Sequence, residues 1–256
     1  MRVVKRAITL LLFLSCLVRP TIGNEGQGKY TYEANLTSDD VDLFIQVVRQ
    51  PLFPENLRNA GYSRGRVDML LELHHDGELR DWLVTEANHR AFAKAVEAVI
   101  DEWEFAPPKK DGKPISLVIP IRVNFEAGSD VISFDMTAGL NHYMRLGSNY
   151  DPGESIKIAE VDKLDKFPEP LHVVKPRAPR SWIEKNNDTV GVFRFFIDTK
   201  GAVRLAHVDH VEGDIDVRLL EVAQDALEQW QFSPPTVNGK GVVVEVKQPF
   251  HFSLLN

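Results

Sequence analysis

The sequence predicts an α+β protein of two repeated units, each a three-stranded antiparallel or mixed sheet with one helix packed on one face. Three observations predict this fold. The motif Trp-x-Phe-x-Pro-Pro occurs twice, at residues 103–108 and 230–235. An amphipathic helix precedes each copy, and alternating apolar and polar residues lie before the helix and after the motif. Because an internal repeat indicates a repeated structural unit, we expect the order β-β-α-β twice, preceded by a short helix.

The first unit is expected to open with a short helix at residues 54–60, which a glycine ends. Residues 66–75 alternate between apolar and polar side chains, which is typical of a strand with one buried face. The chain then turns at Asp76-Gly77, because glycine adopts the positive φ that a tight hairpin requires. Residues 79–85 return as the second strand.

A helix capped by Asn88 is predicted next, because apolar side chains recur at three- and four-residue spacing as far as Trp103. The proline pair that follows ends it. A third strand is expected at residues 115–125. Its apolar face carries Leu117, Ile119, Ile121, Val123 and Phe125.

The second unit repeats this order. Lys200-Gly201 makes its hairpin turn, Asp214 caps its helix, and residues 242–252 form its last strand. The aromatic residues expected in the two cores are Trp103, Phe105, Trp230 and Phe232.

The third strand of each unit is expected at the edge of its sheet. A right-handed crossover through the helix places this strand beside the first strand and parallel to the second. Pro120 and Pro249 fall within the two third strands, and proline is tolerated at sheet edges but not in central strands.

Residues 1–23 resemble an export signal, with a basic start, an apolar stretch and small residues before Asn24. We therefore expect a periplasmic protein. Two alternatives remain, which are an uncleaved N-terminal membrane anchor and lipidation at Cys16, the single cysteine. The rest of the chain divides into a lead-in at 24–48, the first unit at 49–126, a connector at 127–174 and the second unit at 175–256.

Composition is that of a folded globular protein, with 43% hydrophobic and 26% charged residues. The formal net charge is −7, and no stripe of Lys and Arg is present. Nucleic acid is therefore not expected as a partner, because phosphate binding needs clustered positive charge.

No enzyme is expected, since the chain lacks a nucleophile elbow, a phosphate loop and a dinucleotide fingerprint. Neither a metal nor a cofactor is predicted. His74 and His75 should point to opposite faces of a strand, and His207 and His210 should also diverge.

The two Trp-x-Phe regions carry a family resemblance. Glu-Trp-Glu-Phe-Ala-Pro at 102–107, followed by Lys-Lys-Asp-Gly-Lys-Pro at 109–114, resembles the TonB C-terminal domain family. Gln-Trp-Gln-Phe-Ser-Pro at 229–234, with Asn-Gly-Lys at 238–240, is similar to the same pattern. The resemblance implies a periplasmic module that reaches outer-membrane transporters and receives their signal segment as an added strand. The anchor and the proline-rich spacer of a full energy transducer are not evident, so we expect the binding function alone to carry over.

The resulting hypothesis is a tandem binding protein, associated with envelope transport, that recognises extended peptides by strand addition. The edge residues expected to take part are Leu117, Ile119, Ile121 and Val123 in the first unit and Val242, Val244, Val246 and Gln248 in the second. The alternative is an envelope scaffold or a peptidoglycan-binding protein, whose units pair with each other or in a homodimer.

Overall fold

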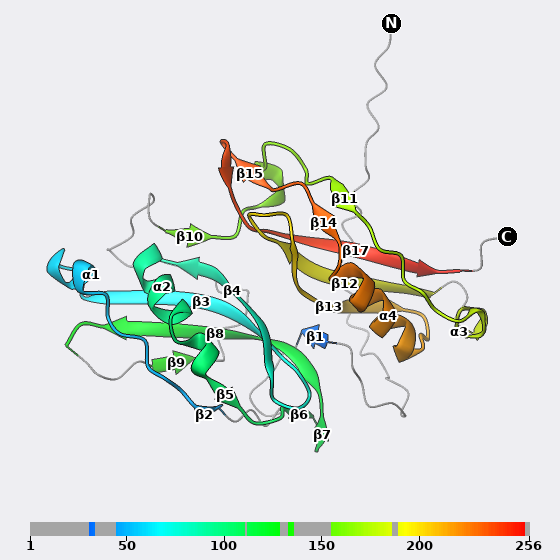
Figure 1. The fold of residues 1–256 in the computed structure, drawn as a ribbon, viewed down its shortest axis with the longest axis horizontal. Helices are drawn as coiled ribbons and strands as arrows, with labels where there is room; N and C mark the ends of the chain where they lie inside the picture. The colour runs from blue at the N-terminus through cyan, green and yellow to red at the C-terminus, as the bar shows by residue number, and fades with distance from the viewer. Residues whose placement is uncertain are drawn as a thin grey trace, which may run out of the picture.

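Two β-hairpins, each extended by a third strand, form the centre of the computed structural model (Figure 1). The structure describes residues 31–33, 45–110, 112–128, 133–135, 155–185 and 189–253. Among these residues, a nine-stranded sheet runs in the order β10-β4-β3-β8-β1-β13-β12-β17, with β9 also paired to β8. The expected α+β class is confirmed. The expected signal at residues 1–23 and Cys16 lie outside the described residues.

In the first unit, β3 (Arg64–Leu73) and β4 (Leu79–Ala87) form an antiparallel hairpin, and β8 (Ser116–Glu126) pairs antiparallel with β3. The third strand therefore lies beside the first, as the crossover rule predicts. One face is covered by α2 (Arg90–Glu97), whose Phe92, Ala93 and Val96 are buried against it. The short helix α1 (Glu55–Asn59) precedes β3.

Residues 189–252 show the same connectivity. The strands β12 (Thr189–Ile197) and β13 (Val203–Glu212) form the hairpin, and β17 (Val244–Phe252) pairs antiparallel with β12. One face is covered by α4 (Val217–Leu227), and α3 (Arg180–Lys185) comes before the hairpin.

The two tryptophans occupy equivalent places in the two units. The indole nitrogen of Trp103 donates to the carbonyl oxygen of Arg49 at 2.9 Å, and that of Trp230 donates to the carbonyl oxygen of Val174 at 2.8 Å. Each bond ties the segment before a unit to the end of its helix region. Trp103, Phe105 and Phe232 are buried, while Trp230 is partly buried.

Short two-stranded ribbons complete both units. They are β2 (Ile45–Val47) with β5 (Glu104–Phe105), β6 (Lys109–Lys110) with β7 (Lys113–Pro114), β11 (Pro170–His172) with β14 (Gln231–Phe232), and β15 (Thr236–Val237) with β16 (Lys240–Gly241). Two 3₁₀ turns lie at Ile100–Glu102 and Val161–Lys163. The ribbons β2–β5 and β11–β14 correspond, because each joins the lead-in of a unit to the strand after its tryptophan.

The helix boundaries differ from those expected. The first helix begins after His89, whose ring accepts from the backbone of Ala91, because the Asn88 side chain instead accepts from the backbone of Arg66. The cap of α4 is Asp216, whose carboxylate accepts from the backbone of Arg218 at 3.0 Å, and not Asp214.

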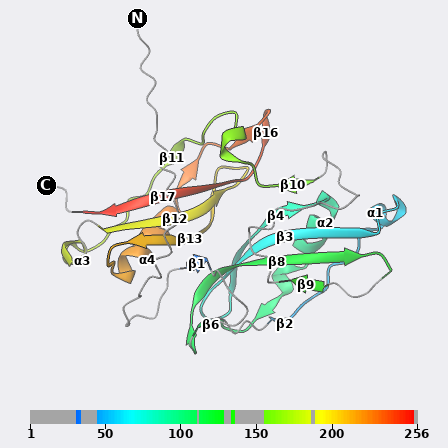
Figure 2. The ribbon, with the colours of Figure 1, turned by 180° about the vertical axis from the view of Figure 1, so that it is seen from behind.

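The faces turned away from the helices meet each other. Leu70, Leu83 and Val118 of the first unit form one buried cluster with Phe196 and Leu205 of the second. The three-residue strand β1 (Thr31–Glu33) lies beside this contact and pairs in parallel with both β8 and β13 (Figure 2). The units are therefore joined through apolar packing and through the sheet itself.

The expectation that β8 is an edge strand is wrong. Its outer side pairs with β1 at Ser116–Val118 and with β9 (Ser133–Asp135) at Arg122–Asn124. These two short strands come from the lead-in and the connector, where three-residue strands leave no readable periodicity. In contrast, β17 lies at the end of the strand order, so the expected edge of the second unit is confirmed.

Candidate functional site

The outer side of β17 is the open edge of the described sheet. On its inner side, β17 pairs with β12 over nine consecutive positions, from Thr189↔Phe252 to Ile197↔Val244, with no register shift. Beyond it, the described pairing is a single parallel bridge between Ala159 and Val244. The strand is therefore held firmly on one side, while most of the other side has no strand partner among the described residues.

The direction of the main-chain groups follows from one hydrogen bond. The backbone N–H of Ala159 donates to the carbonyl oxygen of Val243 at 2.8 Å, so the main chain of residue 243 points away from β12. Because main-chain direction alternates along a regular strand, those of Lys247 and His251 point outward too. Pro249 is also at an outward position, so the N–H that proline lacks would not have bonded to β12.

The valines predicted to select a ligand lie in the core. Val244 is fully buried, and Val246 is 9% exposed in the cluster beneath α4. Val242 lies before β17, and its backbone N–H donates to the carbonyl oxygen of Pro235. The side-chain Nε2 of Gln248 donates to the carbonyl oxygen of Pro249. A strand added to β17 would thus meet main-chain groups, and beside them the side chains of Glu245, Lys247 and His251.

The four residues predicted in the first unit lie in its core as well. Leu117, Ile119, Ile121 and Val123 are each at most 2% exposed. Leu117 and Val123 also have cross-strand partners on the outer side of β8, in β1 and β9. The structure therefore does not bring the two predicted edges together, and the open one belongs to the second unit.

Asp209 on β13 organises the charges on the outer face of this sheet. Its carboxylate accepts from Arg194 Nε at 2.9 Å, from His210 Nδ1 at 2.8 Å and from Lys247 Nζ at 2.7 Å. Burial disfavours the charged form, but these three partners outweigh it and hold the pKa of Asp209 far below its ordinary value. The Lys247 side chain is thereby fixed next to the open edge.

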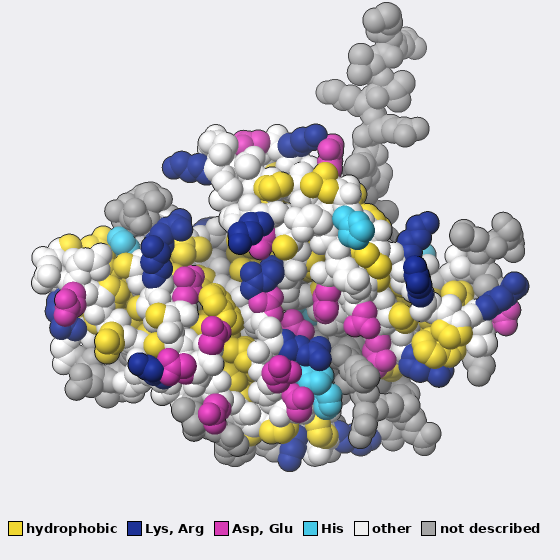
Figure 3. Space-filling model, viewed as in Figure 1, with side chains coloured by type: hydrophobic (Ala, Val, Ile, Leu, Met, Phe, Trp, Pro, Cys, Tyr) yellow, Lys and Arg dark blue, Asp and Glu magenta, His cyan; other side chains and the backbone are white. Residues whose placement is uncertain are grey.

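The face shown in Figure 3 carries acidic and basic side chains in close alternation. Ion pairs between exposed side chains include Lys166 with Glu169 and Arg180 with Glu184.

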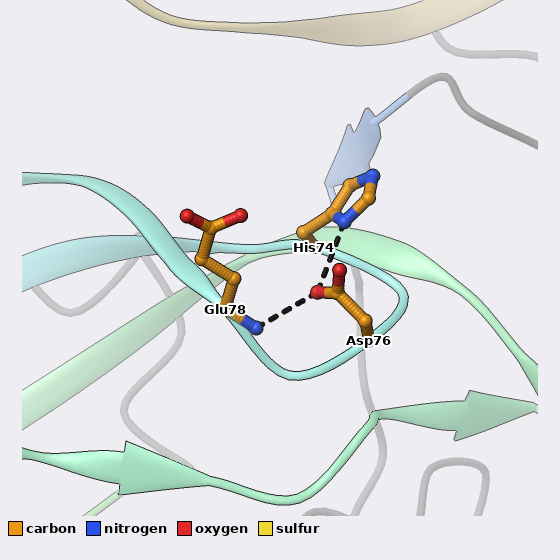
Figure 4. A group of neighbouring side chains, drawn as sticks. All are labelled: His74, Asp76 and Glu78. Atoms are coloured by element: carbon orange, nitrogen blue, oxygen red, sulfur yellow. Dashed lines mark hydrogen bonds and ion pairs between the residues drawn. The ribbon is translucent and has the colours of Figure 1, made fainter.

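Sequence reasoning missed a cluster in the turn between β3 and β4. His74 and His75 were expected on opposite faces, but β3 ends at Leu73 and their rings touch, with His75 Nδ1 2.8 Å from His74 Nε2. Ligand atoms of His74, Asp76 and Glu78 lie within 4.8 Å of one another (Figure 4). The alternation of these ligand-type residues through the turn was the signal that could have revealed the cluster.

His207 and His210 do diverge. The ring of His207 is buried, with Nδ1 2.7 Å from the carbonyl oxygen of Leu205, whereas His210 is exposed beside Asp209. These two histidines therefore do not form a shared site.

A scan against protein families matches residues 49–127 to the C-terminal domain of the Gram-negative bacterial TonB protein. No curated protein and no solved structure matches the chain. Among the described residues, no helix is both long enough and apolar enough to cross a membrane. The matched segment contains the first hairpin, α2 and β8, which are the elements that carry the first copy of the repeat. The first unit is therefore similar to the TonB C-terminal domain, a family associated with the cell envelope and with transport.

Proposed function

We propose that this chain is a non-enzymatic, periplasmic binding protein in which β17 receives an extended peptide as an added strand. The observation that carries the proposal is the position of β17, which is paired along its whole length on one side and ends the described sheet on the other. The partner proposed is a peptide segment of an envelope protein, with outer-membrane transporters as the first class to test. Residues 1–23 would direct export.

Strand addition derives its affinity from main-chain hydrogen bonds, so it needs an edge with regular geometry. The unshifted register of β17 provides this regularity. Selectivity would come from side chains beside the edge, where Glu245, Lys247 and His251 project from the face opposite the buried valines.

The first unit supports the proposal by example. Residues 31–33 add to β8 in parallel, with Tyr32 paired to Leu117. A segment of the lead-in thus pairs with the corresponding strand of the first unit, which supports the proposal that β17 can accept an added strand. The second unit, which repeats the strand order of the first, would be a further TonB-like module with that place open.

Lys247 allows a sharp test. Lys247→Pro removes an outward N–H but no hydrogen bond to β12. Pro249 shows that the strand accepts proline at an outward position. Lys247→Ala is the matched control, because it keeps the N–H while losing the ion pair with Asp209. Synthetic peptides carrying transporter signal segments would be titrated against both variants by NMR and calorimetry. Lys247→Pro should weaken binding at least ~10-fold relative to Lys247→Ala, since one or more main-chain bonds are lost.

Equal affinities for the two variants would show that the outward N–H of residue 247 takes no part in binding. Amide shifts confined to residues far from β17 would contradict the proposal as well.

A scaffold is the second candidate function, and the buried contact between the units favours it. In that case the open edge of β17 would pair with β17 of a second copy, giving a homodimer in the envelope. Light scattering after size-exclusion chromatography separates the two candidates, because Lys247→Pro should convert such a dimer to a monomer. Co-sedimentation with peptidoglycan tests the cell-wall version of this candidate.

A further inference from the structure

The turn between β3 and β4 gathers three side chains of the kinds that bind transition metals. His74 Nδ1 lies 3.0 Å from Asp76 Oδ1, and the Glu78 carboxylate completes a group whose ligand atoms all lie within 4.8 Å (Figure 4). Asp76 and Glu78 are exposed, whereas His74 is 9% exposed. The cluster therefore has one buried nitrogen donor and two carboxylates at the surface.

The His74 ring carries an unusual polar atom. Its Nδ1 is buried and has no hydrogen bond among the described residues, and it lies 3.0 Å from Asp76 Oδ1. A buried polar atom without a hydrogen bond destabilises the folded state, so it needs a physical explanation. A cation held by this nitrogen and the neighbouring carboxylates would supply one.

His75 is placed to set the tautomer of His74. The 2.8 Å contact between His74 Nε2 and His75 Nδ1 allows one proton between them. We assign this proton to His74 Nε2, which leaves the lone pair on Nδ1, toward Asp76. Histidines that bind metals usually donate their second ring nitrogen in this way. The backbone of His75 is itself anchored, because its N–H donates to the hydroxyl oxygen of buried Ser116 at 3.0 Å.

The second hairpin shows that the turn does not require these side chains. Its backbone bonds are the same, since Asp198 N–H donates to Ala202 O and Gly201 N–H donates to Asp198 O, as His74 does to Glu78 and Gly77 does to His74. Here the Asp198 carboxylate accepts from the backbone of Lys200 and Ala202, with no histidine present. Asp76 supports its own turn in a similar way, since its Oδ1 accepts from the backbone of Glu78 at 3.0 Å. His74 and the Glu78 side chain are therefore the ligand-type groups that the comparison leaves without a role in the hairpin.

We propose that the β3–β4 turn binds one divalent transition-metal ion of the zinc class through His74 Nδ1, Asp76 and Glu78, with His75 as the outer partner of His74. Zinc bonds of about 2.0–2.2 Å in a tetrahedron separate ligand atoms by about 3.3 Å, close to the observed His74–Asp76 distance. The Glu78 side chain is exposed and can close the remaining distance. Mixed nitrogen and oxygen ligands suit zinc better than magnesium or calcium, which prefer oxygen alone.

The test uses the full chain, purified without a histidine tag, and ZnCl₂ as the titrant in calorimetry. One ion should bind per chain, and Co²⁺ should give the visible absorption of a tetrahedral site. His74→Ala should abolish this binding, and Asp76→Asn with Glu78→Gln should weaken it at least ~10-fold. His75→Ala should weaken it about 10-fold through loss of the outer partner. His210→Ala is the control, since it removes an exposed histidine of the second unit, and it should leave affinity unchanged.

Two results would overturn the proposal: zinc affinity weaker than about 1 mM in the parent chain, or unchanged affinity in the Asp76→Asn, Glu78→Gln variant. Both carboxylates are exposed, so this double variant should fold even if His74→Ala does not. Circular dichroism confirms the fold of each variant, and loss of zinc binding with retained fold supports the site.

Discussion

Arg204 on β13 donates to both carboxylate oxygens of Asp81 on β4, so an ion pair joins the two units directly. Its Nε lies 2.8 Å from Asp81 Oδ2, and its Nη2 also donates to the carbonyl oxygen of Trp82 at 2.8 Å. Arg204 is followed by Leu205, which belongs to the buried cluster between the units. Polar and apolar contacts thus meet at one junction.

This ion pair should stabilise the fold through a measurable coupling. The two side chains are 30% and 26% exposed, so a double-mutant cycle of Arg204→Ala and Asp81→Ala should give about 1 kcal/mol of coupling in the free energy of unfolding. The exposed pair Arg180–Glu184 within α3 is the comparison, and its coupling should be about 0.3–0.5 kcal/mol. Urea denaturation measures both. Purely additive effects at Arg204 and Asp81 would show that the units are not joined as described.

Leu205 holds a positive φ of 51°, which an L-residue adopts at a cost. It lies at an irregularity in the β12–β13 pairing, and its side chain is 2% exposed. We expect Leu205→Gly to be more stable than Leu205→Ala by about 1 kcal/mol, because glycine removes the backbone strain. Leu70 is in the same cluster without a positive φ, so there alanine should be the more stable replacement by about the same amount. The same ranking at both positions would contradict this account of Leu205.

The two hairpin glycines should be irreplaceable for the same reason. A Cβ on Gly77 would lie 2.5 Å from the carbonyl oxygen of Phe105, and one on Gly201 would lie 1.9 Å from that of Phe232. Both also have positive φ, so alanine at either position should cost at least about 2–3 kcal/mol of stability. Gly239→Ala is the control, because its φ is positive but a Cβ would meet nothing within 4 Å, and it should cost only about 1 kcal/mol. Thermal unfolding of the three variants checks this, and equal losses would refute the proposed contact of each turn with its Trp-x-Phe segment.

Asp209 should make the free energy of unfolding depend on pH. Its pKa in the folded chain is below the unfolded value of about 3.9, so its stabilising effect is complete above that value and is lost as pH falls toward the folded pKa. Asp209→Asn should therefore lower stability by about 2 kcal/mol at pH 7, and the difference from the parent chain should shrink below about pH 4. Urea denaturation from pH 7 to pH 3 measures this. A stability difference between Asp209→Asn and the parent chain that grows as pH falls would contradict a lowered pKa of Asp209.

Strand order could be predicted from the sequence because alternation locates each strand and the right-handed crossover orders it. The positions of β3, β4 and β8 follow from the apolar faces of 66–75, 79–85 and 115–125. Helix caps could not be separated in the same way, since Asn88 and Asp214 have the right side chains but neighbouring residues take the role.

The contact between the units could not be predicted from periodicity. Leu70 and Val118 lie at positions that alternation assigns to solvent, and only the second unit explains why they are apolar. Their hydrophobicity was a readable signal that both faces of each sheet are covered. The pairing of β8 with residues 31–33 and 133–135 was not predicted, because a three-residue strand has too few positions to indicate which strand it joins.

The positions of the His74 and His75 rings were predicted wrongly because the strand was expected to continue to residue 75. Alternation places His74 and His75 on opposite faces only while the chain remains extended, and β3 ends one residue earlier. In the turn the two rings come within 2.8 Å of each other.

Hydrogen exchange along β17, read by NMR with and without a transporter signal peptide, tests the open edge most directly. In the free chain, the amides of Lys247 and His251 should exchange fast, while those of Val246 and Gln248 should be protected by β12. Added peptide should slow Lys247 and His251 selectively. Uniform protection along β17 in the free chain, or unchanged exchange at both residues with the peptide bound, would contradict strand addition at this edge.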